Sequence, residues 1–437
     1  MGINTNELIL YRNFDYQELL DDFVWIINNY DSINYEEIKK SIYTCAGRLV
    51  ELSVHFGFEG NLWHMFLTYC LVNNENAFSR VMEIKGNAKG TVIQLAKNDF
   101  TVFKELYDFD LSLIDKVLGI SCFCFLTDYT GFKQSCCATD EKIRISLHSL
   151  SLSLGSAPGI ETFYNEISGF YKAFGTGKFG MYKAFRILCS GNRVEIVPVG
   201  STENIYLTDL VGYEFQKKEL IKNTEDFIQG LPANNVLLYG DSGTGKSSSI
   251  KAILNEYSDR GLRMIEVYKH QFGHLSAIIE QIRNRNYKFI IYMDDLSFED
   301  YETEYKYLKA IIEGGLEARP DNVLLYATSN RRHLIREKWS DKDDRDDDLH
   351  TNDTVQEKLS LASRFGLSIL YISPNKREFE NIIKVLAEKH GISLPQEELL
   401  LEANRWEMRH GGLSGRTAQH FITYLLGKNR IDAYYID

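Results

Sequence analysis

The chain has 437 residues, which is enough for two to four domains of ordinary size. Its 44% hydrophobic and 25% charged residues are typical of a folded globular protein and exclude wholesale disorder. The net charge of −12, with an acidic excess in both halves, disfavours nucleic acid as the main partner.

Membrane insertion and secretion are also disfavoured by the sequence. No apolar run approaches the roughly 18–20 residues that a helix needs to cross a bilayer. The first 16 residues show no signal-peptide pattern, and Asn6 stands where N-myristoylation requires Ser or Thr. Seven cysteines in a chain of this length are not a disulfide framework. We therefore expect a cytoplasmic protein with no membrane partner.

Residues 1–200 favour a mainly helical N-terminal region, to which we assign the binding of a client. Two short segments are better predicted as strands. A glycine-rich segment contains a Gly-Lys pair but lacks the hydroxyl residue that follows the lysine in a phosphate loop, so we interpret that segment as a surface turn. Apolar residues at helical spacing predict helices over residues 15–30, 35–54 and 61–72. The strand candidates are residues 121–126 and 194–199, and the surface turn is residues 175–179.

From residue 201 onward, short apolar runs alternate with helical patterns. This alternation predicts an α/β domain over residues 201–373, with a five-stranded parallel sheet covered by helices on both faces. Only helical patterns follow, and they predict a helical lid over residues 374–437. The predicted strands are 236–239, 264–267, 289–293, 323–327 and 367–372, and the predicted helices are 247–257, 275–284, 302–313, 376–390, 396–409 and 414–427.

A phosphate-binding loop follows the first of these strands. Residues 240–247 read Gly-Asp-Ser-Gly-Thr-Gly-Lys-Ser and match the P-loop pattern G-x-x-x-x-G-K-[ST]. Glycines let consecutive N–H groups face a phosphate, the lysine reaches the β and γ phosphates, and the following helix adds its positive dipole end. We expect the nucleotide to be bound by Gly240, Asp241, Ser242, Gly243, Thr244, Gly245, Lys246, Ser247 and Ser248.

Two consecutive carboxylates end the strand at residues 289–293. At the carboxyl edge of a parallel sheet they would lie beside the nucleotide phosphates. We expect Asp294 to hold Mg²⁺ together with the Ser247 hydroxyl, and Asp295 to orient the attacking water. An Asp side chain is one methylene shorter than a Glu side chain, so its carboxylate reaches less far towards a water molecule. Glu299 therefore stays open as an alternative base, although we favour Asp295.

Together these motifs resemble the AAA+ P-loop ATPases, over about residues 201–437. The resemblance implies that Val211 and Gly212 pack against the adenine and that Asn330 is the sensor-1 amide, which contacts the γ phosphate or the lytic water. It also implies that Arg364 is an arginine finger acting in trans on a neighbouring subunit, and that Arg416 is the sensor-2 arginine. The catalytic set is then Lys246, Asp295, Asn330, Arg364 and Arg416.

A closer resemblance is to one bacterial family of predicted ATP-binding proteins with a domain of unknown function. It is carried by residues 231–235, 294–299, 315–320 and 327–334, and it extends into the N-terminal part through residues 75–79 and 182–186. This resemblance implies a biochemical activity but leaves the cellular role open.

The sequence therefore predicts an ATPase that uses ATP and Mg²⁺ to remodel an unknown protein client. A finger in trans implies a homo-oligomeric ring, such as a hexamer. Two alternatives stay open: a non-enzymatic ATP-dependent assembly switch, which Asp295 in place of Glu would suit, and a helicase-loader-like nucleic-acid protein. We also interpret Phe272 as a packing residue rather than a pore-loop aromatic, and the acidic run at residues 341–348 as a solvated loop.

Overall fold

The structure is a computed structural model of the chain, and most of the sequence is described in it. The described residues are 2–32, 34–87, 89–131, 141–191, 193–200, 202–299, 302, 304–313, 320–330, 334 and 361–434. The acidic run at 341–348 and the motif residues 315–319 and 331–333 lie outside them. In the described part of the chain, no helix combines the length and the hydropathy that crossing a membrane requires.

Contacts divide the chain into two compact units. The first unit contains Met1–Ala184, Pro198–Thr202 and the short segment Asn284–Asn286. The second unit contains Phe185–Val197, Glu203–Arg283 and Tyr287–Asp437. The first unit thus includes three residues that come from the middle of the predicted α/β region, and the second includes a segment from before residue 201.

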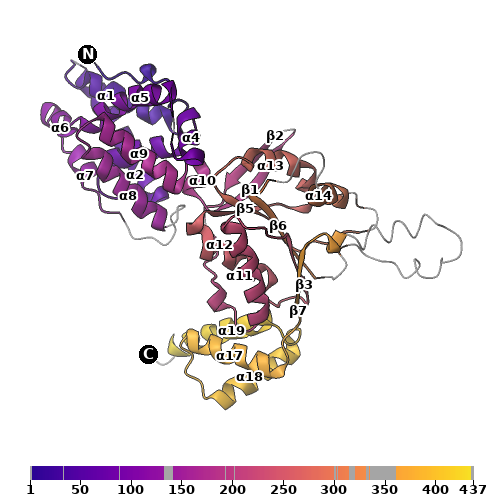
Figure 1. The fold of residues 1–437 in the computed structure, drawn as a ribbon. Coiled ribbons are helices and arrows are strands. Elements are labelled where there is room, and N and C mark those ends of the chain that lie inside the picture. The colour runs from indigo at the N-terminus through magenta and orange to yellow at the C-terminus, as the bar shows by residue number, and fades with distance from the viewer. Residues whose placement is uncertain are drawn as a thin grey trace. The chain divides into compact units, whose positions relative to one another are not determined.

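Helices make up the first unit (Figure 1). The three predicted helices are confirmed as α1, α2 and α3. Helix α3 is buried on nearly all sides, and its Trp63 stacks on Phe23 of α1 with ring centroids 4.4 Å apart. A helix that is apolar all round belongs in the middle of a core. The helices are α1 (Gln17–Asn29), α2 (Tyr35–Phe56), α3 (Leu62–Asn73), α4 (Ala77–Lys85), α5 (Thr91–Asp108), α6 (Ser112–Leu118), α7 (Phe123–Thr127), α8 (Glu141–Gly155), α9 (Ile160–Phe174) and α10 (Gly177–Met181).

The strand predicted at residues 121–126 is wrong, because this segment forms helix α7. The Asp115 carboxylate accepts hydrogen bonds from the backbone N–H groups of Cys122, Phe123 and Cys124, at 3.2, 3.2 and 3.1 Å. These are the N–H groups that the first turn of a helix leaves without partners. A carboxylate supplied from α6 therefore stabilises a helix start that the local apolar alternation does not indicate.

A seven-stranded sheet forms the centre of the second unit, so the predicted five strands were too few. All five predicted strands are present as β3 to β7, and the two further strands come from before residue 201. One of these two, β2, is the strand expected at residues 194–199. The strands are β1 (Ala184–Ser190), β2 (Arg193–Pro198), β3 (Val236–Gly240), β4 (Leu262–Glu266), β5 (Lys288–Met293), β6 (Val323–Ser329) and β7 (Leu367–Tyr371), in the spatial order β2-β1-β4-β5-β6-β3-β7.

The ladders that join β3 to β6, β3 to β7, β4 to β5 and β5 to β6 are parallel. Leu238 in the middle of β3 lies opposite Thr328 on one side and Ile369 on the other. This register brings the carboxyl ends of β3, β5 and β6 to the same edge of the sheet. β1 and β2 are partly exposed and carry few consecutive apolar residues, which explains why they give weaker signals than the buried strands.

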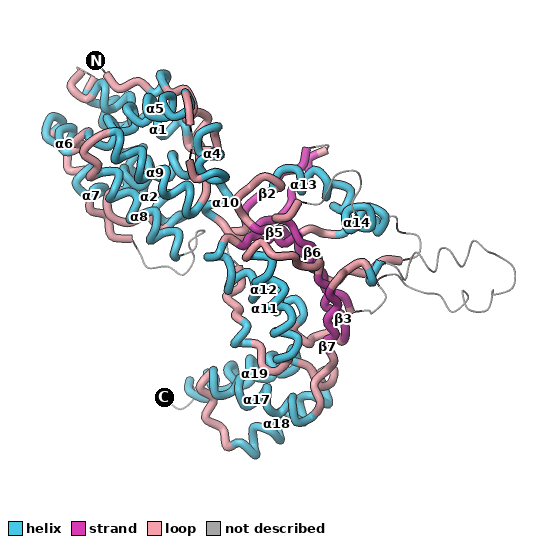
Figure 2. Tube along the Cα trace, viewed as in Figure 1, coloured by secondary structure: helices cyan, strands magenta, loops and turns pink. Residues whose placement is uncertain are grey.

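Helices lie on both sides of this sheet (Figures 1 and 2). Helices α11 (Glu214–Ile228) and α12 (Lys246–Tyr257) lie on one side, and α13 (Leu275–Ile282) and α14 (Glu304–Glu313) on the other. Before α13, Phe272 in the 3₁₀ helix Lys269–His274 is 1% exposed, which confirms its interpretation as a packing residue.

Three helices follow β7 and share a small core of their own. They are α17 (Lys376–Lys389), α18 (Gln396–Arg409) and α19 (Gly415–Tyr434). Phe379 and Ile383 of α17 pack with Leu399 of α18 and Phe421 of α19, and all four side chains are buried. An Asn375 capping box begins α17, because its side chain accepts the Glu378 N–H and the Glu378 carboxylate accepts the Asn375 N–H.

Candidate nucleotide-binding site

A cavity of about 850 Å³ opens within the second unit, at the carboxyl edge of the sheet. Its walls come from the segment before α11, the loop between β3 and α12, the ends of β5 and β6, and helices α17 and α19. Of the predicted site residues, the cavity is lined by Val211, Ser242, Gly243, Thr244, Gly245, Lys246, Ser247, Ser248, Asp294, Asp295, Asn330 and Arg416.

The loop between β3 and α12 needs glycine at its start. Gly240 has φ +130°, and a Cβ atom there would lie 2.0 Å from the Tyr371 carbonyl oxygen, so β7 leaves no room for a side chain. The next residue, Asp241, turns its carboxylate outward to accept the Ser373 N–H at 2.7 Å. Both residues lie outside the cavity lining and instead fix the loop to the chain that follows β7.

Lys246 is the first residue of α12 and is 6% exposed. Its ammonium donates hydrogen bonds to the carbonyl oxygens of Gly240 at 3.0 Å and Asp241 at 2.6 Å, and to Asn330 Oδ1 at 3.0 Å. Burial lowers the pKa of this amine, while the nearby Asp241 and Asp295 raise it, and the net shift is downward. The loop thus wraps around the cation that is expected to meet the phosphates.

Asp294 and Ser247 present oxygen atoms side by side. The Ser247 hydroxyl donates to Asp294 Oδ1 at 2.6 Å, and the Thr328 hydroxyl donates to the same oxygen, also at 2.6 Å. Burial raises the pKa of Asp294, but these hydrogen bonds outweigh it, so the pKa lies below its ordinary value. An ionised carboxylate beside a hydroxyl is the kind of donor set that Mg²⁺ uses, so these residues fit that ion.

Asp295 and Lys246 are bridged by the side-chain amide of Asn330. The Asn330 Nδ2 group donates to Asp295 Oδ1 at 2.8 Å, while its Oδ1 accepts from Lys246. The charges of the two partners fix this orientation of the amide, because only its oxygen can accept from an ammonium and only its NH₂ can donate to a carboxylate. Glu299, the alternative base, is not among the described residues that line the cavity.

The N-terminus of α19 approaches the phosphate loop closely. The Arg416 backbone N–H donates to the Gly243 carbonyl at 3.2 Å, and Ser414 caps the helix by accepting the Thr417 N–H at 3.1 Å. A Cβ atom on Gly243, which has φ +74°, would lie 3.0 Å from Ser414 Oγ. The N-terminus of α19 therefore contacts the loop directly, and Arg416 lines the cavity.

The segment that contains Val211 and Gly212, before α11, is held by a buried lysine. Lys217 donates to the carbonyl oxygens of Leu210 at 2.6 Å and Leu207 at 3.4 Å. Val211 lines the cavity together with Ile382 and Leu386 of α17, and the charged pair of Asp209 and Lys389 also belongs to the lining. Gly212 has φ +83° and lies outside the lining.

Arg364 lies apart from these residues. It pairs with the Glu313 carboxylate at the end of α14 and does not belong to the described lining of the cavity.

Two contributors were missed in the sequence: the Thr328 hydroxyl and the Lys217 ammonium. Thr328 stands two residues before Asn330 in the predicted element, so its place at a strand end was visible. No local signal marks Lys217.

Solved structures of RuvB from Thermotoga maritima are similar to part of the chain. One RuvB variant is 18% identical, with a TM-score of 0.34, and the match covers 50% of this chain and 63% of the RuvB chain. A second variant is 17% identical, with a TM-score of 0.36, and the match covers 51% of this chain and 65% of the RuvB chain. The Holliday junction branch migration motor RuvB is 16% identical, covers 50% of this chain and 72% of its own, and has a TM-score of 0.32. The chain thus spans less than two thirds of the length of the first two.

No protein of curated function matches the chain in sequence. Residues 181–429 match the family described as "Protein of unknown function (DUF815)". Because this match spans more than half of the chain, the chain belongs to that family, which confirms the predicted membership of a family with a domain of unknown function.

Proposed function

We propose that the protein binds ATP with Mg²⁺ in the cavity of the second unit and hydrolyses it. The observation that carries this proposal is the chain of contacts from Lys246 through Asn330 to Asp295. It places a cation for the phosphates, an amide and a carboxylate in one row at the sheet edge. A binding site alone would need the cation but would have no use for a second carboxylate beside it.

Each residue has a task in this reaction. Lys246 and Arg416 neutralise the phosphate oxygens, and the N–H groups of residues 242–248 surround them at the start of α12. Asp295 and Asn330 hold a water molecule in line with the γ phosphorus. As that water attacks, Asp295 takes its proton, and the bond to the leaving ADP breaks. A bound Mg²⁺, held by Ser247 and Asp294, would supply charge neutralisation at the β and γ phosphates.

We assign Asp295 rather than Glu299 as the base, because Asp295 lines the cavity and Glu299 does not. The helices α17 to α19 then act as a lid, since Arg416 and Gly243 meet directly. Lid movement would report whether the γ phosphate is present. We further propose that this movement remodels a protein client bound by the first unit.

Arg364 acts from a neighbouring subunit in this scheme. Its absence from the described lining of its own cavity and its pairing with Glu313 support an arginine that completes the site of another copy in a homo-oligomeric ring. The Glu313 carboxylate would hold the guanidinium ready until a neighbour's phosphates compete for it.

Steady-state ATPase assays on the full chain test this function. We expect Mg²⁺-dependent turnover that rises with protein concentration, because the complete site requires two copies. Arg364→Ala should lower turnover by about 10³-fold or more and leave ATP affinity nearly unchanged. Normal turnover in Arg364→Ala would remove the finger in trans and leave the nucleotide site itself in place.

The alternative of a non-enzymatic switch is separated by the same assay. An assembly switch would bind ATP and change its oligomeric state, but turnover would stay below about one event in many minutes, as in slow intrinsic nucleotide switches. The acidic net charge argues against a nucleic-acid loader. Direct, salt-dependent binding of the full chain to single- or double-stranded DNA would revive that alternative.

A further inference from the structure

The turn that follows β5 is joined to the end of β6 by a set of short hydrogen bonds. The Asp295 N–H donates to the Thr328 hydroxyl oxygen at 2.9 Å, and the Leu296 N–H donates to the Thr328 carbonyl at 2.7 Å. The Ser329 hydroxyl donates to the Leu296 carbonyl at 2.8 Å. Consecutive residues of the turn that carries both carboxylates are thus held by consecutive residues of the neighbouring strand.

Within this set, the Thr328 hydroxyl contacts both acidic residues. It donates to Asp294 Oδ1 at 2.6 Å while it accepts the N–H of Asp295. A hydroxyl has one proton, so its donation to the carboxylate and its acceptance from the amide are both fixed. Thr328 is 2% exposed, which leaves water little room to replace either bond.

Asp295 has an unusual backbone conformation. Its φ is +50°, and it is one of only four non-glycine residues with positive φ in the described part of the chain. This conformation is disfavoured for a residue with a Cβ atom and persists only where the surroundings hold it. Two hydrogen bonds from the turn that follows β5 to Thr328, through the Asp295 and Leu296 amides, are such a restraint.

The restraint separates the two neighbouring carboxylates. Asp294 accepts from Ser247 and Thr328, on the side of the expected metal ion. Asp295 accepts from Asn330, on the side of the expected water. Since Asp reaches less far than Glu, its backbone must be placed more accurately to bring the carboxylate to a water molecule.

We propose that the Thr328 hydroxyl is the positioning group that assigns Asp294 to the metal ion and Asp295 to the attacking water. This inference rests on the proposed ATP hydrolysis and adds a residue that acts through both carboxylates. The hydroxyl itself neither transfers a proton nor binds the phosphates. Its role explains how a site with Asp at the position of the base can be competent for hydrolysis.

Three variants of the full chain test the role. Thr328→Val keeps the shape of the side chain but removes the hydroxyl, whereas Thr328→Ser retains it. Ser329→Ala is the matched control, because it removes a neighbouring hydrogen bond of the same turn without touching either carboxylate. The readouts are kcat and KM for ATP with Mg²⁺, and the Kd of a fluorescent ATP analogue in EDTA.

We expect kcat of Thr328→Val to fall about 100-fold, as for a displaced catalytic group, with its Kd in EDTA unchanged. Thr328→Ser and Ser329→Ala should both stay within about threefold of the wild type. Wild-type kcat in Thr328→Val would overturn the positioning role alone. If Thr328→Val lowered kcat and also weakened binding of the analogue in EDTA, the residue would have a merely structural role. The same would follow if Thr328→Ser failed to keep kcat near that of the wild type. A wild-type chain without turnover would overturn the proposed function and this role with it.

Discussion

The same four residues, Gly-Thr-Gly-Lys, occur twice in this chain, at 175–178 in the first unit and at 243–246 in the second. In both places a glycine with positive φ lies at the start of a helix: Gly177 is the first residue of α10, and Gly245 directly precedes α12. Helix α10 has five residues and α12 has twelve. Only the second copy lines the cavity described above.

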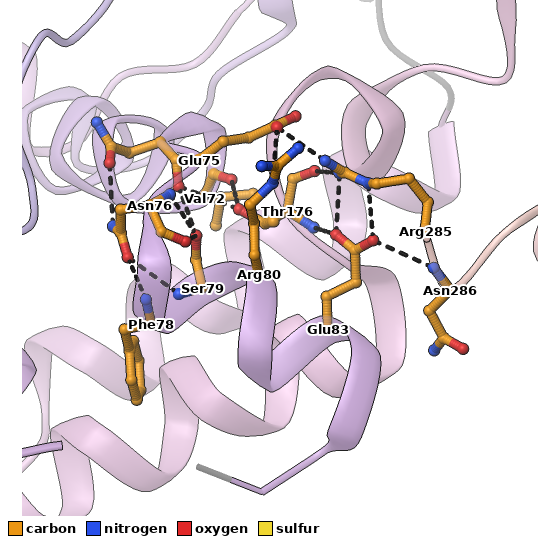
Figure 3. A network of polar contacts seen from close by, with 11 residues as sticks. Val72, Glu75, Asn76, Phe78, Ser79, Arg80, Glu83, Thr176, Arg285 and Asn286 are labelled. Carbon is orange, nitrogen blue, oxygen red and sulfur yellow. Dashed lines mark hydrogen bonds and ion pairs between the residues drawn. The ribbon is translucent and has the colours of Figure 1, made fainter. Parts of the chain in front are cut away.

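The first copy is filled by other parts of its own unit (Figure 3). The Glu83 carboxylate accepts the Thr176 N–H at 3.1 Å, and Arg285 donates to the Thr176 carbonyl at 2.9 Å. Arg285 also pairs with Glu83 at 2.9 Å and with Glu75 at 2.7 Å. The backbone N–H and carbonyl of Thr176 are therefore already paired with side chains of the same unit, and the tertiary partners, not the tetrapeptide, decide whether such a loop can bind a ligand.

The largest expected effect on this comparison comes from removing Arg285, the cation that pairs with Glu83 beside the first GTGK segment. Arg285→Met would leave Glu83 buried without its charge partner, and removal of one member of a buried pair costs about 3–5 kcal/mol. We expect this loss in the free energy of unfolding, measured by urea denaturation followed by circular dichroism.

A neighbouring arginine provides the control. Arg80 also approaches Glu75, at 3.7 Å, but its side chain is 55% exposed. Arg80→Met should therefore cost less than about 1 kcal/mol. Equal stability of the two variants would mean that the buried pair contributes nothing to the first unit, and that its GTGK segment is not held as we describe.

The next test compares the two lysines. Lys246→Ala should weaken ATP binding by about 100-fold, or roughly 2.7 kcal/mol, because in the proposed function its ammonium binds the phosphates. Lys178→Ala removes the lysine of the filled copy and should leave ATP affinity within about twofold. Titration with a fluorescent ATP analogue measures both. An equal loss in the two variants would show that the filled copy also takes part in nucleotide binding.

The filled copy also shows the limit of local sequence patterns. The sequence predicts a surface turn at residues 175–179, yet Thr176 is fully buried and Phe179 is 3% exposed, so this prediction was wrong. The partners that bury the segment, Glu83 and Arg285, are about ninety residues or more away in the sequence. No pattern within the segment itself indicates these partners.

The GTGK segment at residues 243–246 was predictable because its sequence signals are local. A buried strand, a glycine-rich loop and a helix follow one another within about twenty residues, and each has its own pattern. The five buried strands of the parallel sheet share this property. The partly exposed strand β1 does not, and the helix α7 depends on a carboxylate from α6, so both escaped prediction.

Within the site, residue types were predictable but their pairing was not. The motif places Asp294, Asp295 and Asn330 at strand ends, where the sheet topology brings them together. That Asn330 bridges Lys246 and Asp295, and that Thr328 binds both acidic residues, depends on the register of β5 against β6. Arg364 and its pairing with Glu313 likewise depend on the tertiary fold.

The smallest expected effect concerns backbone strain at Asp295, in the turn that follows β5 in the second unit. Asp295→Gly should be more stable than Asp295→Ala by about 1 kcal/mol, because glycine adopts φ near +50° without a steric penalty. Ser258, with φ −57° at the end of α12, is the control: there the Ala variant should be the more stable by about 1 kcal/mol. Thermal and urea unfolding measure both differences. If alanine proved as stable as glycine at position 295, the turn would be unstrained, and Thr328 would have no strained conformation to hold.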